Sequence, residues 1–236
     1  MSLSRKLTIC GVLMTSLLSF NSAVAGHLNP AEKGRHNVGY LSMEVELTPG
    51  ISTTANVWYP VARGSSYLPA TTYEALISFP FGTEAIGLES TLGAVQNAPI
   101  KRGVYPLVIQ THGCCAVQAG NINGLAHTRA LELLASHGIV AVSFTRRDQS
   151  LRSSMNIMID AVTSALPGSI DENKIGIAGE SFGARDSLSY GAGVSLPQFG
   201  FELPADPRVK AILVQDAPLP ATTSEVQLAE MSIPFM

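Results

Sequence analysis

Lys174-Ile-Gly-Ile-Ala-Gly-Glu-Ser-Phe-Gly-Ala184 is the stretch around which this 236-residue sequence is organised. A short apolar run leads into the pentapeptide Gly179-Glu-Ser-Phe-Gly183, and a helix-compatible segment follows. This is a G-x-S-x-G motif in the strand–turn–helix context of a nucleophile elbow, where glycines let strand and helix pass close to a serine on a sharp turn. The motif predicts Ser181 as a catalytic nucleophile. With 21 glycines in the chain, however, the pentapeptide alone is weak evidence.

The composition is typical of a single globular domain. With 46% hydrophobic residues, the chain can bury a substantial core. A formal charge of −3, without a basic run after the first few residues, disfavours binding to nucleic acid. No cofactor is expected. A metal site is disfavoured because Cys114 and Cys115 have no second Cys or His pair at ligand spacing.

The first 25 residues have the features of a secretory signal peptide. Two basic residues precede an apolar stretch from Leu7 to Phe20, and Ala23-Val-Ala25 matches an A-x-A cleavage site. The alternative is a membrane anchor, but the apolar stretch is short and interrupted by Thr and Ser. We therefore expect one domain over residues 26–236, secreted or periplasmic after cleavage near Ala25.

The cysteines that remain after cleavage are adjacent. Cys114 and Cys115 are not expected to pair with each other, because the geometry would strain the peptide between them. Two unpaired thiols are unusual in an exported protein. They are either buried as small apolar residues or lack a partner cysteine.

Strands and helices alternate along most of the chain. Two alternating segments flank the turn Pro49-Gly50 and predict an N-terminal hairpin, residues 37–48 and 53–59. Later apolar runs predict strands at 107–111, 139–144, 174–178 and 209–214, and the start of another at 232–236. Helical patterns lie at 124–136, 153–166, 182–192 and 223–231.

This order of elements predicts an α/β fold with a mostly parallel sheet and helices on both faces. The antiparallel hairpin would lie at one edge of the sheet. Residues 61–105 lack clear periodicity. They are expected to be either a lid or lipid-facing surface, or an ordinary insertion packed on the core.

Catalysis by Ser181 would need donors for a developing oxyanion. In such a sheet the chemistry collects at the carboxyl ends of the strands. Two backbone N–H groups suffice, one from the residue after the nucleophile and one from the loop after the third strand of the sheet. These are Phe182 and Cys114, and His112-Gly113 opens the second loop.

The expected acid is Asp216, at the end of the strand that follows the nucleophile helix. The alternative is an aspartate that merely forms the turn before Ala217-Pro218. Glu180 and Asp186 lie too close in sequence to Ser181 to orient a separate base. We expect them to make local polar contacts.

The base is harder to assign. The mature sequence has five histidines: His27, His36, His112, His127 and His137. The first two lie near the mature N-terminus, the third is expected to hold its loop, and the last should lie at the wrong end of the sheet. His127, early in the helix after the oxyanion loop, is a weak candidate. In the order Ser…Asp…His the base follows the acid, and no histidine follows Asp216.

Four segments occur in the order seen in one branch of the α/β-hydrolases: Thr111-His-Gly113, Leu134-Ala-Ser-His-Gly-Ile-Val-Ala-Val-Ser-Phe-Thr-Arg-Arg-Asp-Gln-Ser150, Gly179-Glu-Ser-Phe-Gly183 and Ala211-Ile-Leu-Val-Gln-Asp-Ala-Pro218. The chain resembles the plasma-type platelet-activating-factor acetylhydrolases and their bacterial, dienelactone-hydrolase-like relatives, most clearly from Pro106 to Asp216. The resemblance implies an α/β-hydrolase fold with Ser181 as nucleophile and Asp216 as acid. It also implies the N–H groups of Cys114 and Phe182 as the oxyanion hole.

The sequence departs from this family in two ways. Glu180 stands where the family usually has histidine. The family's base lies near the end of the domain, beyond two further strands, whereas this sequence stops at Ile233-Pro-Phe-Met236. The resemblance therefore implies a C-terminally truncated domain that lacks its last strands and its base, and that is weakly active or inactive.

The expected function is hydrolysis of short-acyl esters, phospholipids included, by a serine acyl-enzyme route, with transient contact with a lipid surface. Two alternatives stay open. One is a catalytically incomplete hydrolase-fold fragment or a carbohydrate- or lipid-binding module. The other is a dienelactone-type hydrolase with a cysteine nucleophile, which the position of Cys114 and Cys115 outside the elbow disfavours.

Overall fold

The computed structural model describes residues 29–62, 69–79, 81–113, 122–145, 154–193 and 206–216. The chain from Lys33 onward forms one compact unit, which contains all the elements below. The predicted signal peptide, the two adjacent cysteines, the helix expected at 223–231 and the last expected strand lie outside the described residues. Within these ranges, no helix is long and apolar enough to cross a membrane.

Most predicted elements are present, several with longer bounds. The strands are β1 (Asn37–Thr48), β2 (Ile51–Val61), β3 (Thr72–Phe79), β4 (Gly82–Glu89), β5 (Val95–Gln96), β6 (Tyr105–Thr111), β7 (Val140–Phe144), β8 (Ile170–Glu180) and β9 (Val209–Gln215). The helices are η3 (Ile122–Leu125, a 3₁₀ turn), α2 (Thr128–Ser136), α3 (Ser154–Ala165) and α4 (Phe182–Ala192).

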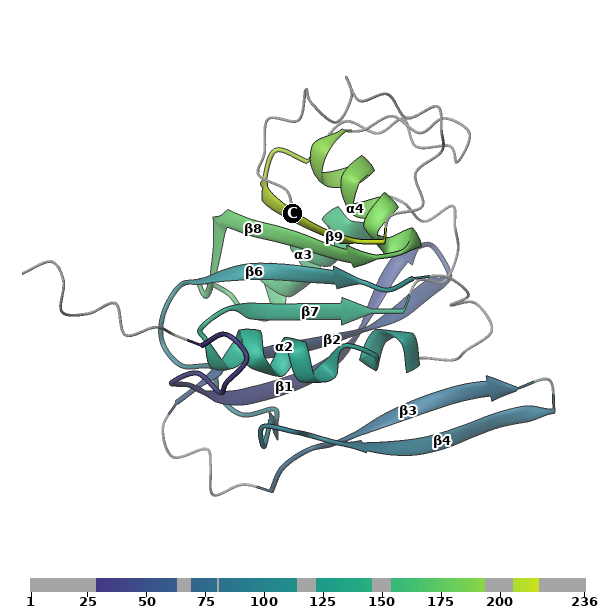
Figure 1. Ribbon diagram of the computed structural model, residues 1–236, viewed down its shortest axis with the longest axis horizontal. Coiled ribbons are helices and arrows are strands. Elements are labelled where there is room, and N and C mark those ends of the chain that lie inside the picture. Colours follow the sequence, from purple (N-terminus) through teal and green to yellow (C-terminus); the bar gives the residue numbers. More distant parts are fainter. Residues whose placement is uncertain are drawn as a thin grey trace, which may run out of the picture. The chain divides into compact units, whose positions relative to one another are not determined.

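The main sheet has seven strands in the order β5-β1-β2-β7-β6-β8-β9 (Figure 1). Strands β7, β6, β8 and β9 are mutually parallel, whereas β1 and β2 form the predicted antiparallel hairpin. The hairpin lies at one edge, with only the short β5 outside it. Because β6 is flanked by β7 on one side and β8 on the other, their carboxyl ends meet where the winding of the sheet reverses.

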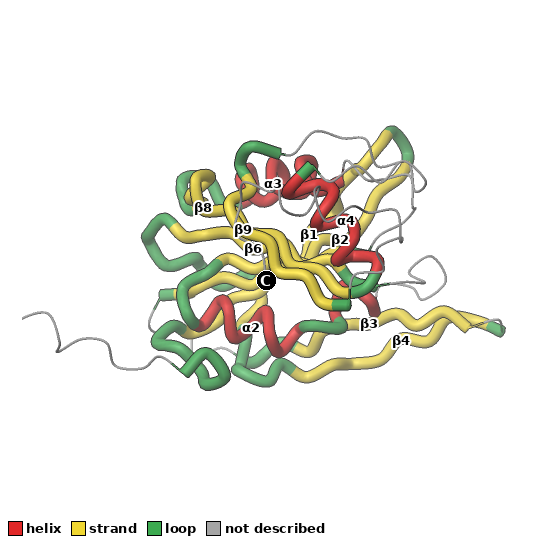
Figure 2. The backbone as a smooth tube through the Cα atoms, turned by 45° about the horizontal axis from the view of Figure 1, so that its top comes forward, coloured by secondary structure: helices red, strands yellow, loops and turns green. Residues whose placement is uncertain are grey.

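Helices cover both faces of the sheet (Figure 2). Helix α2 packs on one face, with Leu131 against Trp58 and Ala141. Helix α3 packs on the other, where Met158 joins the neighbouring strand residues Val57 and Val142. Successive strand residues therefore pack against opposite helical layers, because side chains along a strand alternate between its two faces. Helix α4 shares the α3 face through the cluster of Met155, Ile177, Tyr190, Val209 and Ile212.

The helix predicted at 124–136 is in two parts. The 3₁₀ turn η3 ends at Leu125, and α2 begins at Thr128, whose hydroxyl donates a hydrogen bond to the Leu125 carbonyl. His127, between them, has φ −105° and ψ 18°, outside the helical range. The break leaves His127 at the N-terminus of α2, next to the carboxyl ends of the strands.

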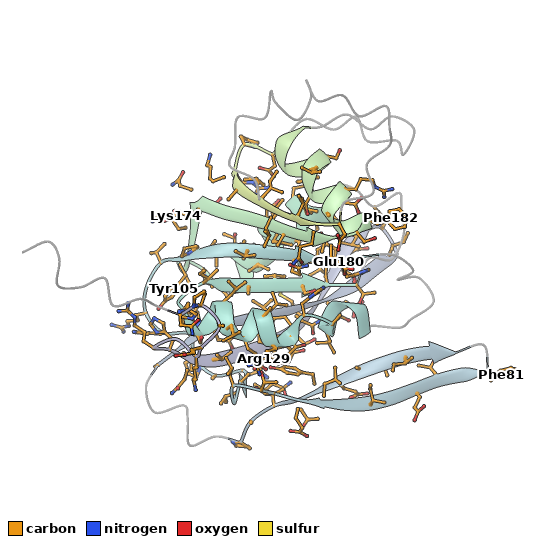
Figure 3. The ribbon with its side chains drawn as sticks, in the orientation of Figure 1. Phe81, Tyr105, Arg129, Lys174, Glu180 and Phe182 are labelled. Atoms are coloured by element: carbon orange, nitrogen blue, oxygen red, sulfur yellow. The ribbon has the colours of Figure 1, made fainter. Side chains whose placement is uncertain are left out.

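Residues 61–105 are more regular than predicted. Strands β3 and β4 pair from Thr72↔Glu89 to Phe79↔Gly82 as a separate two-stranded ribbon, with Phe81 at its tip (Figure 3). The base of the ribbon packs on the core beneath α2, through the buried Tyr73 and Ala75. The base is thus packed on the core, as in an ordinary insertion, whereas the outer part of the ribbon, with Phe81, is exposed. The alternation was hard to detect because alanine and glycine occupy several of its positions.

A buried glutamate ties this ribbon to the domain. Glu132 of α2 accepts hydrogen bonds from the Tyr73 hydroxyl (2.6 Å), the Thr91 hydroxyl (2.7 Å) and the Leu92 N–H (2.7 Å). The Trp58 indole N–H donates to the Tyr73 oxygen (3.0 Å). Burial, followed by the hydrogen bond to Glu132, raises the pKa of Tyr73, so the phenol remains a donor. Buried polar groups satisfied in this way fix one packing arrangement.

Replacing Tyr73 with Phe should lower the free energy of unfolding by about 1.5–3 kcal/mol, because a buried carboxylate oxygen and an indole N–H lose their shared partner. Tyr59→Phe is the matched control. It removes a single hydrogen bond to the Ala98 carbonyl and should cost about 1 kcal/mol. Urea denaturation measures both. A loss for Tyr73→Phe no larger than for Tyr59→Phe would contradict the role given to Glu132.

Candidate active site

Ser181 occupies the sharp turn between β8 and α4. Its backbone has φ 54° and ψ −118°, a combination that residues other than glycine adopt only when their surroundings enforce it. Two hydrogen bonds hold the turn. The Ser181 N–H donates to the Gln215 carbonyl (2.8 Å), and the Arg185 N–H donates to the Ser181 carbonyl (3.2 Å). This is the strained strand-to-helix geometry of a nucleophile elbow.

The two glycines of the pentapeptide are there for steric reasons. A Cβ on Gly179 would lie 2.3 Å from the Gly183 carbonyl oxygen. A Cβ on Gly183 would lie 2.4 Å from the carbonyl oxygen of Thr111, at the end of β6. Distances this short exclude any side chain, so the elbow depends on glycine at both positions.

Thr111 connects the end of β6 to the elbow through hydrogen bonds. Its buried hydroxyl lies 3.2 Å from the Ala178 carbonyl and 3.0 Å from the Gly183 carbonyl. The Ser187 hydroxyl of α4 donates to the same Gly183 carbonyl (2.8 Å). Strand β6, strand β8 and helix α4 are thereby joined at one point. Neither hydroxyl was singled out from the sequence, because both interactions depend on tertiary contacts.

The loop after β6 passes directly beside the serine. A Cβ on Gly113 would lie 3.1 Å from the Ser181 Cβ, so this glycine allows the close approach that an oxyanion loop needs. The buried His112 ring lies with Nδ1 2.8 Å from the Gly113 carbonyl oxygen, in keeping with the loop-holding role expected for it. Phe182 begins α4, whose N-terminus carries partial positive charge. Cys114 lies outside the described residues.

Asp216 reaches the same edge of the sheet through strand register. Strands β8 and β9 are parallel and pair Glu180 with Gln215. Asp216 follows Gln215, whose carbonyl receives the Ser181 N–H, and it too has a positive φ of 51°. The predicted nucleophile and the predicted acid thus follow neighbouring strands at the same level.

Glu180 makes a contact that sequence separation concealed. Its Oε2 lies 3.8 Å from Nε2 of His127, so the prediction of a purely local contact for Glu180 is wrong. The partner is the N-cap residue of α2, a helix on the face of the sheet opposite α4 (Figure 2). His127 is therefore brought to the residue adjoining Ser181.

Two other histidines lie at the opposite end of the sheet. His137 is the C-cap residue of α2, and His36 lies against the following Gly138. Burial, and then the positive charge of Lys101, lowers the pKa of His36. Their position agrees with the expectation that His137 is remote from Ser181. His27 lies outside the described residues.

The first turn of α4 carries a buried ion pair. Nη2 of Arg185 lies 3.2 Å from Oδ1 of Asp186, which agrees with the local contact predicted for Asp186. The Arg185 guanidinium also lies over the Phe182 ring, 4.6 Å from its centroid. These contacts stiffen the residue that would supply one oxyanion donor.

No family model matches this sequence, and comparison with curated proteins gives no match. Among solved structures, the chain is similar to a ferulic acid esterase from Streptomyces cinnamoneus, at 16% identity and a TM-score of 0.51, over 85% of this chain and 72% of that one. The chain has the α/β-hydrolase fold. An acylaminoacyl peptidase from Pyrococcus horikoshii also aligns, at 10% identity and a TM-score of 0.44, over 77% of this chain and 23% of that one.

Replacing Gly183 with Ala should destabilise the domain by about 3 kcal/mol or more, because the new methyl group overlaps the Thr111 carbonyl. Gly176→Ala, in the neighbouring strand β8, is the matched control. Its Cβ would meet Val108 Cγ2 at an ordinary 3.6 Å, and the change should cost under about 1 kcal/mol. Thermal and urea denaturation measure both variants. Equal stability of the two would refute the steric role of Gly183.

Proposed function

We propose that this protein is a serine hydrolase that cleaves carboxylic esters through an acyl-enzyme. The observation that carries the proposal is the backbone of Ser181, held at φ 54° between β8 and α4 and directly beside Gly113. A positive φ at a serine on this turn presents the hydroxyl at the top of the sheet, where an ester carbonyl can approach it. Strain of this kind is retained at functional sites.

The proposed reaction begins with attack of the Ser181 Oγ on the ester carbonyl. The carbonyl π electrons move to the oxygen, and the N–H groups of Phe182 and Cys114 stabilise that oxyanion. The serine proton passes to a histidine base and then to the leaving alcohol. Water, deprotonated by the same base, hydrolyses the acyl-enzyme and regenerates the serine. Each step uses only general acid–base and nucleophilic chemistry.

Asp216 is the proposed acid that orients the base. Its support is the register of β8 with β9, which aligns Asp216 with the elbow. Among the described histidines on this edge, the His112 ring lies against its own loop, whereas His127 contacts Glu180. His127 therefore stays the weak candidate for the base among the described histidines, and the contact recorded for it is with Glu180.

Short-acyl esters are the proposed substrates, with phospholipids among them. This finer assignment rests on the resemblance to acetylhydrolases. That resemblance is found in the segments around Thr111, Ser181 and Asp216. A serine rather than a cysteine at the elbow favours the esterase over the dienelactone-type reaction. The predicted signal peptide adds the proposal that the reaction takes place outside the cytoplasm.

Hydrolysis of p-nitrophenyl acetate tests the proposal. We expect slow turnover by the natural protein and a loss of at least about 10³-fold in Ser181→Ala, because the nucleophile is removed. Ser164→Ala, an exposed serine of α3, is the matched control and should keep full activity. If both proteins hydrolyse the ester faster than buffer alone and Ser181→Ala is as fast as the natural protein, a serine mechanism at this site would be contradicted.

A further inference from the structure

Glu180 places an ionisable group at the rim of the site for which the proposed reaction has no use. We propose that Glu180, with His127, forms a charged wall beside Ser181 that selects substrates by charge. Esters with a neutral or ammonium-bearing group near the scissile bond would be accepted, and esters with a carboxylate there would be disfavoured. This inference rests on the proposed function and narrows its substrate class.

The position of the carboxylate follows from three distances. Oε2 of Glu180 lies 3.5 Å from the point where a Cβ on Gly113 would be, and that point lies 3.1 Å from the Ser181 Cβ. The same Oε2 lies 3.8 Å from Nε2 of His127. Glu180 therefore borders the space between the serine and the oxyanion loop, on the side of the sheet that α2 covers.

Both side chains are accessible from solvent. The Glu180 side chain is 44% exposed and the His127 side chain 29% exposed. This exposed carboxylate lies close enough to Ser181 for its charge to act on a substrate bound at the serine.

The wall has a defined charge. Arg185, on the other side of the elbow, lies against Asp186, whereas Glu180 pairs with the imidazole of His127. The Glu180 carboxylate therefore sets the sign of the wall. A monocationic and a monoanionic reagent, each about 6–8 Å from a half-exposed carboxylate, should differ in local concentration. At low salt the cation should be about tenfold more concentrated there than the anion.

A thiol in place of the serine hydroxyl measures this charge without any catalysis. In Ser181→Cys, the rate of modification by a cationic methanethiosulfonate, the trimethylammonium-ethyl reagent, is compared with that by the anionic sulfonatoethyl reagent. Peptide mass spectrometry separates residue 181 from Cys114 and Cys115. The ratio of the two rates cancels changes in thiolate content, because both reagents attack the same thiolate.

We expect the cation-to-anion ratio in Ser181→Cys at pH 8 and low salt to exceed that of the Ser181→Cys, Glu180→Gln double variant by about tenfold. Adding Glu172→Gln, which removes an exposed carboxylate from the opposite half of β8, should leave the ratio unchanged. Adding Glu180→Asp to Ser181→Cys keeps the carboxylate charge and should retain most of the cation-to-anion preference. The preference should also fall when sodium chloride is raised to 0.5 M.

A ratio that Glu180→Gln leaves unchanged would overturn the inference. If that double variant does not fold, loss of the ratio's salt dependence in Ser181→Cys itself would overturn it equally. The outcome is independent of the proposed function, because thiol modification needs neither a base nor an oxyanion hole. Failure of ester hydrolysis by the natural protein would therefore refute the enzyme without touching the charge measurement, and the reverse also holds.

Discussion

The close approach of three backbone segments at Ser181 is the constraint on which the site depends. Gly179, Gly183 and the end of β6 at Thr111 lie so near one another that no Cβ fits at either glycine. This contact forces the chain from strand into helix within one residue and leaves Ser181 with a positive φ. The hydroxyls of Thr111 and Ser187 satisfy the carbonyls that the contact brings together. Strain at one residue is thus offset by packing and hydrogen bonds around it.

The sheet then decides which other groups reach that serine. Parallel strands β6, β8 and β9 end at one edge, so the residues soon after them, Gly113, Ser181 and Asp216, lie along that edge. Helix α2, on the opposite face from α4, adds His127 at the same edge. The exposed Glu180–His127 pair adds charge at this edge, where the exposed Asp216 also lies.

Sequence patterns predicted the local structure of the chain and missed contacts between residues far apart in sequence. Apolar periodicity placed the strands and helices of the domain, and the pentapeptide placed the turn at Ser181, because each signal lies within about ten residues. The ribbon of β3 and β4 was missed because small residues weaken its alternation. The partner of Glu180 was missed because His127 approaches only when α2 packs across the sheet. Asp216 could be placed at the edge of the elbow because it follows the next strand directly, and its role as the acid stays a prediction.

Ser181 is proposed to be a nucleophile presented by this elbow. Labelling of the natural protein with a fluorophosphonate, followed by peptide mapping, tests it most directly, because the reagent forms a covalent bond only with an activated serine. The account predicts a single phosphonylated peptide containing Ser181, and loss of that label after unfolding of the protein. Labelling that is absent, or that is spread over other serines and survives unfolding, would contradict the account.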